Sequence, residues 1–311
     1  MTSHLLSARL SEAFASKEIN LAIPTSKLDK EKDEKALTMD LKLAHPVDND
    51  FWFKTARDWG EGNSSYYQGT TLAGGWDRAY GRTWRAGAFI SYGSFSFADN
   101  FSHNGVKDTR MGIYGGYSNG PHSGYIYLDH GWINNDLTRR LTGLGLQAKA
   151  DYNSRILELS GEYRYDLNAK NMKIWHVSPY AKIQLSQLWQ DGYTEQGGGI
   201  FGHKVGSQSN SYFAGGLGLE FKRHLTNGNY AFRLGIKHAF KGTDPKFTYS
   251  YIGNDTKCYE LHGQQDKTHF IMSLGGEAEF APGWTLAGDL ALQKSGHDKD
   301  IMAAVTLRRM W

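Results

Sequence analysis

The chain has almost nothing that could cross-link it, and it has no long apolar run. Its 311 residues include one cysteine, Cys258, and six prolines. A single cysteine excludes an intramolecular disulfide and a cysteine-based zinc site. No apolar run approaches the ~18 residues of a membrane-spanning helix, which excludes a helical membrane protein. A membrane β-barrel stays open, because only every second residue of its strands faces lipid.

An excess of one charge sign and a secretion signal are also missing. The 35 Lys and Arg residues nearly balance 32 Asp and Glu residues, for a net charge of +3, which argues against a dedicated nucleic-acid binder. Residues 1–6 lack the basic and apolar regions of a signal peptide. The chain is therefore either cytoplasmic or a fragment of a longer precursor, and the strand pattern favours the fragment.

Glycine and aromatic residues are abundant, and a period of two dominates the chain from residue 51 onward. Glycine accounts for 37 residues and aromatics for 14%. In one segment Leu157 and Leu159 alternate with Glu158 and Ser160. One face of each segment is apolar with aromatics near its ends, and the other carries glycine and charge. This pattern is typical of a membrane barrel with a wet lumen.

About twelve such segments can be counted, and their connections alternate in character. Short turns, such as 226–228 and 281–283, alternate with longer polar stretches near 99–107, 138–148, 191–209 and 250–265. Short turns on one side and long loops on the other are typical of outer-membrane barrels. The predicted fold is an all-β, transmembrane antiparallel β-barrel of about 12 strands, with an N-terminal α-helix in the lumen.

The first fifty residues differ from the rest. Residues 3–16 predict a helix, with Ser3 as its cap and Leu6 and Leu10 at helical spacing. Residues 25–36 are charged and poor in apolar side chains, and residues 37–43 alternate like a short strand. We therefore divide the chain into a helix that is a candidate lumen plug (1–22), a charged linker (23–50) and a barrel (51–311).

Motifs of soluble enzymes are better explained by the barrel. Residues 116–120 match G-x-S-x-G, but the serine ends a strand and no helix follows, so a hairpin turn is expected. Glycines at 197–202 match a dinucleotide motif without a following helix, and we expect an outer loop. His130 beside Asp129 would need a serine within reach to act as a hydrolase. We predict no catalytic residue, no cofactor and no metal site.

Several segments resemble the C-terminal translocator domain of type V autotransporters. The matching stretches are residues 72–77 (Leu-Ala-Gly-Gly-Trp-Asp), 161–165 (Gly-Glu-Tyr-Arg-Tyr) and 179–185 (Pro-Tyr-Ala-Lys-Ile-Gln-Leu). The last three strands, from Gly275 to the terminal Trp311, follow the closing pattern of the family. The final strand is similar to the signal that the outer-membrane assembly machinery reads, which assigns this role to Ile301, Ala303, Val305, Leu307 and Trp311.

The resemblance implies a location, partners and a function. The location is the outer membrane of a Gram-negative bacterium, and the protein is a monomer. The partners are outer-membrane lipids, a passenger N-terminal to this chain, the assembly machinery and periplasmic chaperones. The barrel anchors the passenger and helps to export it through or with its pore. A stand-alone channel or porin-like barrel, with residues 1–45 as its plug, is the alternative; a barrel-housed enzyme and a soluble β-sandwich binding module are less favoured.

The alternation also predicts which charges line the lumen. In a translocator they would bind the plug helix and pass an unfolded passenger, whereas mutual ion pairing would simply fill the barrel. We favour ion pairing over catalysis, and helix docking as their function. The predicted lumen-lining charges are Arg85, Arg110, Glu158, Glu162, Arg164, Lys182, Glu220, Arg233, Lys237, Glu277, Glu279, Asp289 and Arg308.

Overall fold

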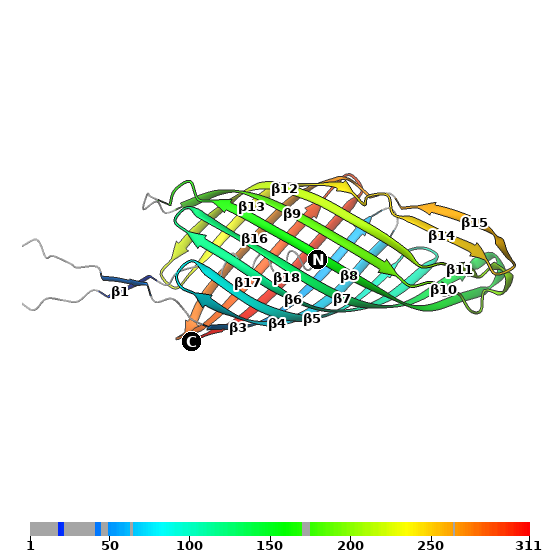
Figure 1. Cartoon of the computed structure of the whole chain (residues 1–311), viewed down its shortest axis with the longest axis horizontal. Coiled ribbons are helices and arrows are strands. Elements are labelled where there is room, and N and C mark those ends of the chain that lie inside the picture. The colour runs from blue at the N-terminus through cyan, green and yellow to red at the C-terminus, as the bar shows by residue number, and fades with distance from the viewer. Residues whose placement is uncertain (1–17, 22–40, 45–48, 63–64, 170–174, 264) are drawn as a thin grey trace, which may run out of the picture.

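Twelve antiparallel strands form one closed barrel in the computed structural model (Figure 1). The structure describes residues 18–21, 41–44, 49–62, 65–169, 175–263 and 265–311. The barrel strands are β3 (Asn49–Gly62), β4 (Ser65–Tyr80), β5 (Trp84–Ala98), β6 (Ser102–Asn119), β7 (His122–Leu141), β8 (Leu146–Tyr165), β9 (Trp175–Gln190), β12 (Gln208–Leu225), β13 (Gly228–Lys241), β16 (Thr268–Ala281), β17 (Trp284–Lys294) and β18 (Asp298–Met310).

Closure of the barrel depends on pairing between its first and last strands. β18 pairs with β3 in an unbroken antiparallel register, from Asp298 opposite Gly62 to Met310 opposite Asp50. Every strand of the barrel therefore has two neighbours, and no edge is left with unpaired backbone groups. The predicted all-β, twelve-strand antiparallel barrel is confirmed.

Alternation of burial explains why these sequences close into a barrel. In β3, Trp52, Lys54, Ala56 and Asp58 are buried, while the residues between them are half-buried or exposed. On the outward face large apolar side chains are exposed, among them Leu217 at 69%. Such a surface is unfavourable in water and suits a hydrocarbon environment. The apolar faces therefore point outward and the mixed polar faces point inward.

The two ends of the barrel differ in their connections. At one end, called the turn end, tight turns contain Gly81 and Gly283, whose φ angles of +67° and +74° favour glycine. The backbone N–H of Asn49 donates to the carbonyl of Trp311 at 3.1 Å, so both ends of the barrel sequence meet there. The opposite end, called the loop end, carries the longest connections.

Four short strands form a separate sheet beyond the loop end (Figure 1). They are β10 (Tyr193–Thr194), β11 (His203–Val205), β14 (Lys246–Tyr251) and β15 (Asn254–His262), and we call them the loop sheet. A two-way backbone bridge between Lys149 and Gln196 joins this sheet to β8. The long polar segments 191–209 and 250–265 are thus partly ordered as strands.

Two expectations about the lengths of connections were wrong. The segments near 99–107 and 138–148 are mostly strand rather than long loops. β6 begins at Ser102, and a turn that ends at Gly145, in the left-handed conformation, joins β7 to β8. Polar residues there continue the strands past the apolar belt, where solvent rather than lipid covers them.

The predicted helix at residues 3–16 lies outside the described residues. Glu18–Leu21 (β1) and Leu41–Ala44 (β2) pair antiparallel, so the described residues of the predicted plug, 18–21, are strand rather than helix. β2 overlaps the short strand predicted at 37–43. Within the described part of the chain, the helices are two 3-10 turns, Thr142–Leu144 (η1) and Gly199–Phe201 (η2), and none is long or apolar enough to cross a membrane.

Candidate functional site: the charged interior of the barrel

Strand alternation carries charged side chains to the inside of the barrel. In β8, Glu158, Glu162 and Arg164 are buried, whereas Leu157 and Tyr163 on the opposite face are exposed. Since successive residues of a strand point to opposite faces, the charged residues share one inward row. The same alternation holds around the barrel.

The structure places every predicted lumen-lining charge on the inward face. Six of them are at most 5% exposed, and the others are partly buried. Some of them form ion pairs across one intervening strand, as Arg164 does with Glu220 and Arg308 with Glu277, which requires side chains that extend over the inner surface of the barrel. The six most deeply buried are Arg85, Glu158, Glu162, Arg164, Glu220 and Arg308.

A four-residue cluster links β8, β12 and β13. Arg164 Nη1 lies 3.3 Å from a carboxylate oxygen of Glu220, and its Nε lies 3.0 Å from Glu162. Arg233 Nε donates to Glu220 at 2.6 Å, and its Nη1 lies 3.5 Å from Glu162. Two guanidinium groups therefore share two carboxylates, and the cluster spans the intervening strand β9. We call it the Glu220 cluster.

A second cluster closes the inside near the turn end. Arg308 bonds Asp50 at 3.0 Å and Glu277 at 2.6 Å, while Arg85 pairs with Asp77. Trp52 Nε1 donates to the hydroxyl of Tyr114 at 2.8 Å beside this cluster. Bulky side chains and ion pairs fill this part of the barrel.

The middle of the barrel separates acidic from basic groups. Arg110 of β6 lies 2.7 Å from Asp108, 3.5 Å from Asp129 and 3.8 Å from Glu158. Lys182 of β9 and Lys237 of β13 line a small cavity of about 60 Å³. The wall formed by β6, β7 and β8 is thus mainly acidic, and the wall formed by β9 and β13 carries lysines.

Several inward polar residues escaped prediction from sequence. Lys54 bonds Asp289 at 2.9 Å, and the Tyr67 hydroxyl donates to Asp300 at 2.8 Å. Asp58 is 4% exposed. These residues were missed because the apolar Trp52 and the charged Lys54 lie on the same face of β3. The strand therefore cannot be divided into one apolar face and one charged face. The alternation of exposed Phe51 and Phe53 with these residues was the available signal.

The enzyme-like motifs do not assemble into a reactive site. Asp129 is 1% exposed on the inward face, whereas His130 lies on the other face and contacts Trp132 edge to ring, with centroids 4.6 Å apart. Adjacent strand residues on opposite faces cannot form a dyad. Gly120, at the end of the G-x-S-x-G match, has a φ of +57° in the turn between β6 and β7. Among the described residues, no group of three or more His, Cys, Asp or Glu could hold a metal ion.

The predicted assembly-signal residues lie on the outward face of the last strand. Val305 and Leu307 are 49% and 37% exposed, and they alternate with buried Ala304 and Thr306. Ile301 and Ala303 share their row, and Trp311 follows the strand at the turn end. An apolar stripe that ends in an aromatic residue is therefore accessible from outside the barrel.

A buried ion pair holds the loop sheet beside the barrel. Arg139 of β7 bonds both oxygens of Glu195, at 3.0 and 2.5 Å, and the backbone N–H of His203 donates to Glu195 at 2.7 Å. Burial alone would raise the pKa of Glu195, but these bonds lower it below its ordinary value. Burial and then Arg139 lower the pKa of His203, which packs 4.1 Å from the ring of Tyr249.

Comparison with known proteins places this architecture among bacterial translocators. The family model described as the autotransporter β-domain matches residues 51–291. The translocator domain of NalP from Neisseria meningitidis has a TM-score of 0.72 at 16% identity, covering 85% of this chain and 88% of that one. The β-domain of BrkA from Bordetella has a TM-score of 0.68 at 19% identity, covering 85% and 100%.

A curated relative is similar over a shorter stretch. Esterase EstA of Pseudomonas aeruginosa is 24% identical over 185 residues, which are 58% of this chain. The chain spans 28% of the length of that esterase.

Proposed function

Since the chain belongs to the autotransporter β-domain family, we propose that it anchors an N-terminal passenger in the outer membrane and helps to export it. The barrel lies in the outer membrane of a Gram-negative bacterium. The family match over residues 51–291 carries this proposal. The closed barrel with a charged inside supports it, because such a barrel satisfies its backbone in lipid while offering a polar path.

The polar interior suits an extended or helical chain rather than an apolar solute. The Glu220 cluster presents both charge signs along the wall, and so does Arg110 with Asp108, Asp129 and Glu158. Peptide groups and charged side chains of a passing chain would exchange hydrogen bonds with them. We propose that residues 1–22 dock against these charges after export and restrict leakage. The linker predicted at 23–50 would join them to the barrel, although its last two residues belong to β3.

The remaining partners also belong to this proposal. The outward stripe of β18 would present Val305, Leu307 and Trp311 to the outer-membrane assembly machinery. Periplasmic chaperones would carry the unfolded chain to that machinery, and the inserted barrel would act as a monomer. No nucleotide or cofactor enters this mechanism.

The name of the curated relative does not extend to this chain. Esterase activity is stated of a protein of which this chain spans 28%. Translocator domains are transport units, and we propose that this chain has no esterase activity of its own. The alternative function is that of a stand-alone channel. Such a channel would not export a fused passenger, which would stay on the periplasmic side.

Surface display of a fused reporter tests the proposed function. An unstructured, epitope-tagged peptide fused ahead of Met1 should become accessible to external protease on intact cells. Ala304→Pro, which removes a ladder hydrogen bond between β18 and β17, should abolish display together with barrel formation. A barrel that inserts normally while its reporter stays protected from protease would refute the translocator assignment and favour the channel.

A further inference from the structure

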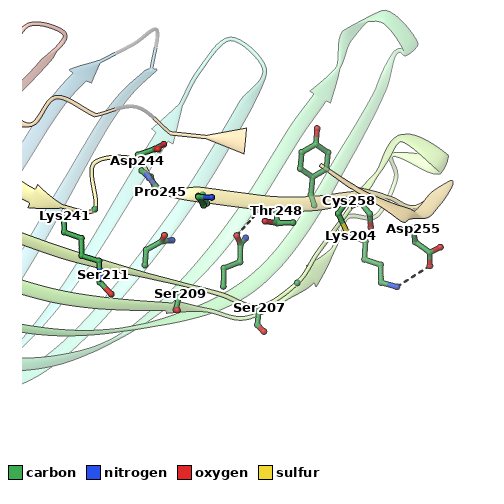
Figure 2. Close-up of a pocket in the computed structure, with 17 residues that line it drawn as sticks. Lys204, Ser207, Ser209, Ser211, Lys241, Asp244, Pro245, Thr248, Asp255 and Cys258 are labelled. Carbon is green, nitrogen blue, oxygen red and sulfur yellow. Dashed lines mark hydrogen bonds and ion pairs between the residues drawn. The ribbon is translucent and has the colours of Figure 1, made fainter. Parts of the chain in front are cut away.

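A polar cavity opens at the loop end, between the barrel wall and the loop sheet. Its volume is about 730 Å³. The start of β12, including Ser209 and Ser211, forms one wall, and β14, including Thr248, forms another (Figure 2). Lys241 and the segment that follows it close the side nearest the barrel.

The height of this cavity relative to the apolar belt follows from strand register. Ser209 pairs with Trp189, and Phe213 pairs with both Leu185 and Lys241. Trp189 and Phe213 are exposed on the outward face, so Ser209 and Ser211 continue the same outward row. Aromatic residues of a membrane barrel mark the interface with the headgroups. The cavity therefore begins where the belt ends, at the level of the outer-leaflet headgroups.

The lining is rich in hydroxyl and amide groups and carries three lysines. Lys241 forms no ion pair within the described residues. Lys204 lies 3.7 Å from Asp255, and Lys246 lies 2.8 Å from Glu260, both in solvent-exposed pairs that a stronger anion can replace. Asp244 and Asp255 also line the cavity, so the lysines exceed the aspartates by one.

A hydroxyl group of β14 adds to the polar lining. Ser250 is 7% exposed and lines the cavity. It stands in one cross-strand row with Lys204 and Cys258. A hydroxyl group of a ligand can replace the solvent that reaches Ser250 in the cavity.

We propose that this cavity binds the phosphorylated saccharide headgroup of an outer-leaflet glycolipid. Lys241 and Lys246 receive the phosphate, because ammonium groups bind phosphate as point charges. Ser209 and Ser250 bond the sugar hydroxyls, and Ser211, whose hydroxyl donates to Gln187 Oε1, accepts from one of them. The acyl chains of the same molecule extend down the exposed surface formed by Phe213 and Phe240.

Lipid binding by the refolded full chain tests the proposal. Native mass spectrometry in neutral detergent would count bound lipid A that carries its inner-core sugars and phosphates, with phosphatidylglycerol as an anionic lipid without sugar. We expect preferential binding of the glycolipid, and a loss of about tenfold in affinity in Lys241→Gln, since one charge-assisted contact is removed. Ser211→Ala should weaken binding less.

Lys294→Gln is the matched control. Lys294 is also an exposed lysine at the loop end, paired with the outward Phe270, but it lies outside the cavity. It should bind the glycolipid like the unmodified chain. Equal loss in both variants, or equal binding of phosphatidylglycerol, would reduce the effect to general charge attraction and overturn the proposal.

A water-soluble phosphosugar distinguishes the source of the ligand. Free glucosamine phosphate should compete only weakly, because it lacks the acyl chains that contact the belt. Competition as strong as by the glycolipid would overturn the assignment to a membrane lipid. A control for folding is migration on an SDS gel. A closed barrel runs faster before heating than after it, and binding is compared only between variants that show this shift.

Discussion

At the scale of single residues, two adjacent glycines of β4 face opposite environments. A Cβ atom on Gly75 would lie 2.6 Å from Cζ2 of Trp52 and 2.7 Å from the carbonyl oxygen of Ala88. We expect Gly75→Ala to lower the free energy of unfolding by about 1–3 kcal/mol, because the indole is held by its bond to Tyr114 and cannot retreat freely. Urea titration in lipid vesicles measures this change.

Gly74→Ala is the control for that substitution. Its Cβ would meet only a backbone oxygen, at 3.7 Å, which is ordinary contact. We expect little effect on stability. Equal destabilisation by the two variants would show that strand flexibility, and not the indole contact, requires glycine here.

The Glu220 cluster makes a different prediction at the same scale. Glu220→Gln leaves Arg164 and Arg233 with a single shared carboxylate inside the barrel, and breaking a buried pair costs about 3–5 kcal/mol. We expect this loss in the free energy of unfolding, measured by urea titration. The double variant Glu220→Gln/Arg233→Met should recover part of it.

Glu61→Gln is the matched control, because Glu61 is exposed near the end of β3. Its effect should stay within about 0.5 kcal/mol. If Glu220→Gln were as mild, solvent inside the barrel would have to replace the missing carboxylate, and the ion pairs would contribute little to stability.

At the scale of elements, the attachment of the loop sheet should depend on pH. The folded state lowers the pKa of both Glu195 and His203, so protonation of either group disfavours the attached sheet. The stabilisation is complete above the ordinary histidine pKa of about 6.5. It is lost first as His203 gains a proton below that pH, and then as Glu195 does so below its lowered pKa.

Hydrogen exchange of residues 193–205 measures this effect. After correction for intrinsic exchange rates, the protection of the amides of residues 193–205 should fall on acidification. The protection of the amides of β7 and β8 should stay constant. His203→Gln should remove the first part of the change, and Glu195→Gln should lower protection even at neutral pH. A flat profile for the unmodified chain would contradict the role assigned to the two groups.

The barrel strands were predictable from sequence, whereas the loop sheet was not. A membrane strand alternates lipid-facing and inward residues, and this periodicity, interrupted by turns, revealed twelve segments. β15 is exposed on nearly every residue, so it carries no alternation. Its order depends on pairing with β14, which depends in turn on β11, a strand from a distant part of the sequence.

The sequence predicted which charged side chains face the inside of the barrel, but not which of them form ion pairs with each other. Alternation placed Glu220 and Arg233 inward, yet Arg164 joins them only because β8 and β12 both pair with β9. Cross-strand register decides which charges meet, and one sequence does not contain that register directly. Asp58 and Tyr67 were missed because aromatic residues on both faces of β3 and β4 hide the alternation.

At the scale of the whole molecule, the inside of the barrel carries more carboxylates than lysines and arginines. Three carboxylates surround Arg110. Nearer the loop end, Asp58 Oδ2 is buried without a hydrogen-bond partner among the described residues, and Asp300 bonds neutral Tyr67 and Gln293. A low-dielectric wall strengthens the resulting negative potential along the path. Cations should therefore enter more readily than anions.

This excess predicts weak cation selectivity once the path is open. A chain that begins at residue 49, reconstituted in a planar bilayer, should give a reversal potential that favours potassium in a potassium chloride gradient. Asp58→Asn combined with Asp300→Asn should move that potential toward zero, because both carboxylates lie on the inward path. Asp136→Asn removes an exposed charge of β7 and should leave it unchanged. Anion preference in the unmodified barrel would mean that Lys182 and Lys237, rather than the acidic wall, control the narrowest passage.

The full chain should conduct less than the shortened one if residues 1–22 occupy the path, so the two measurements separate the charge of the wall from the presence of the plug.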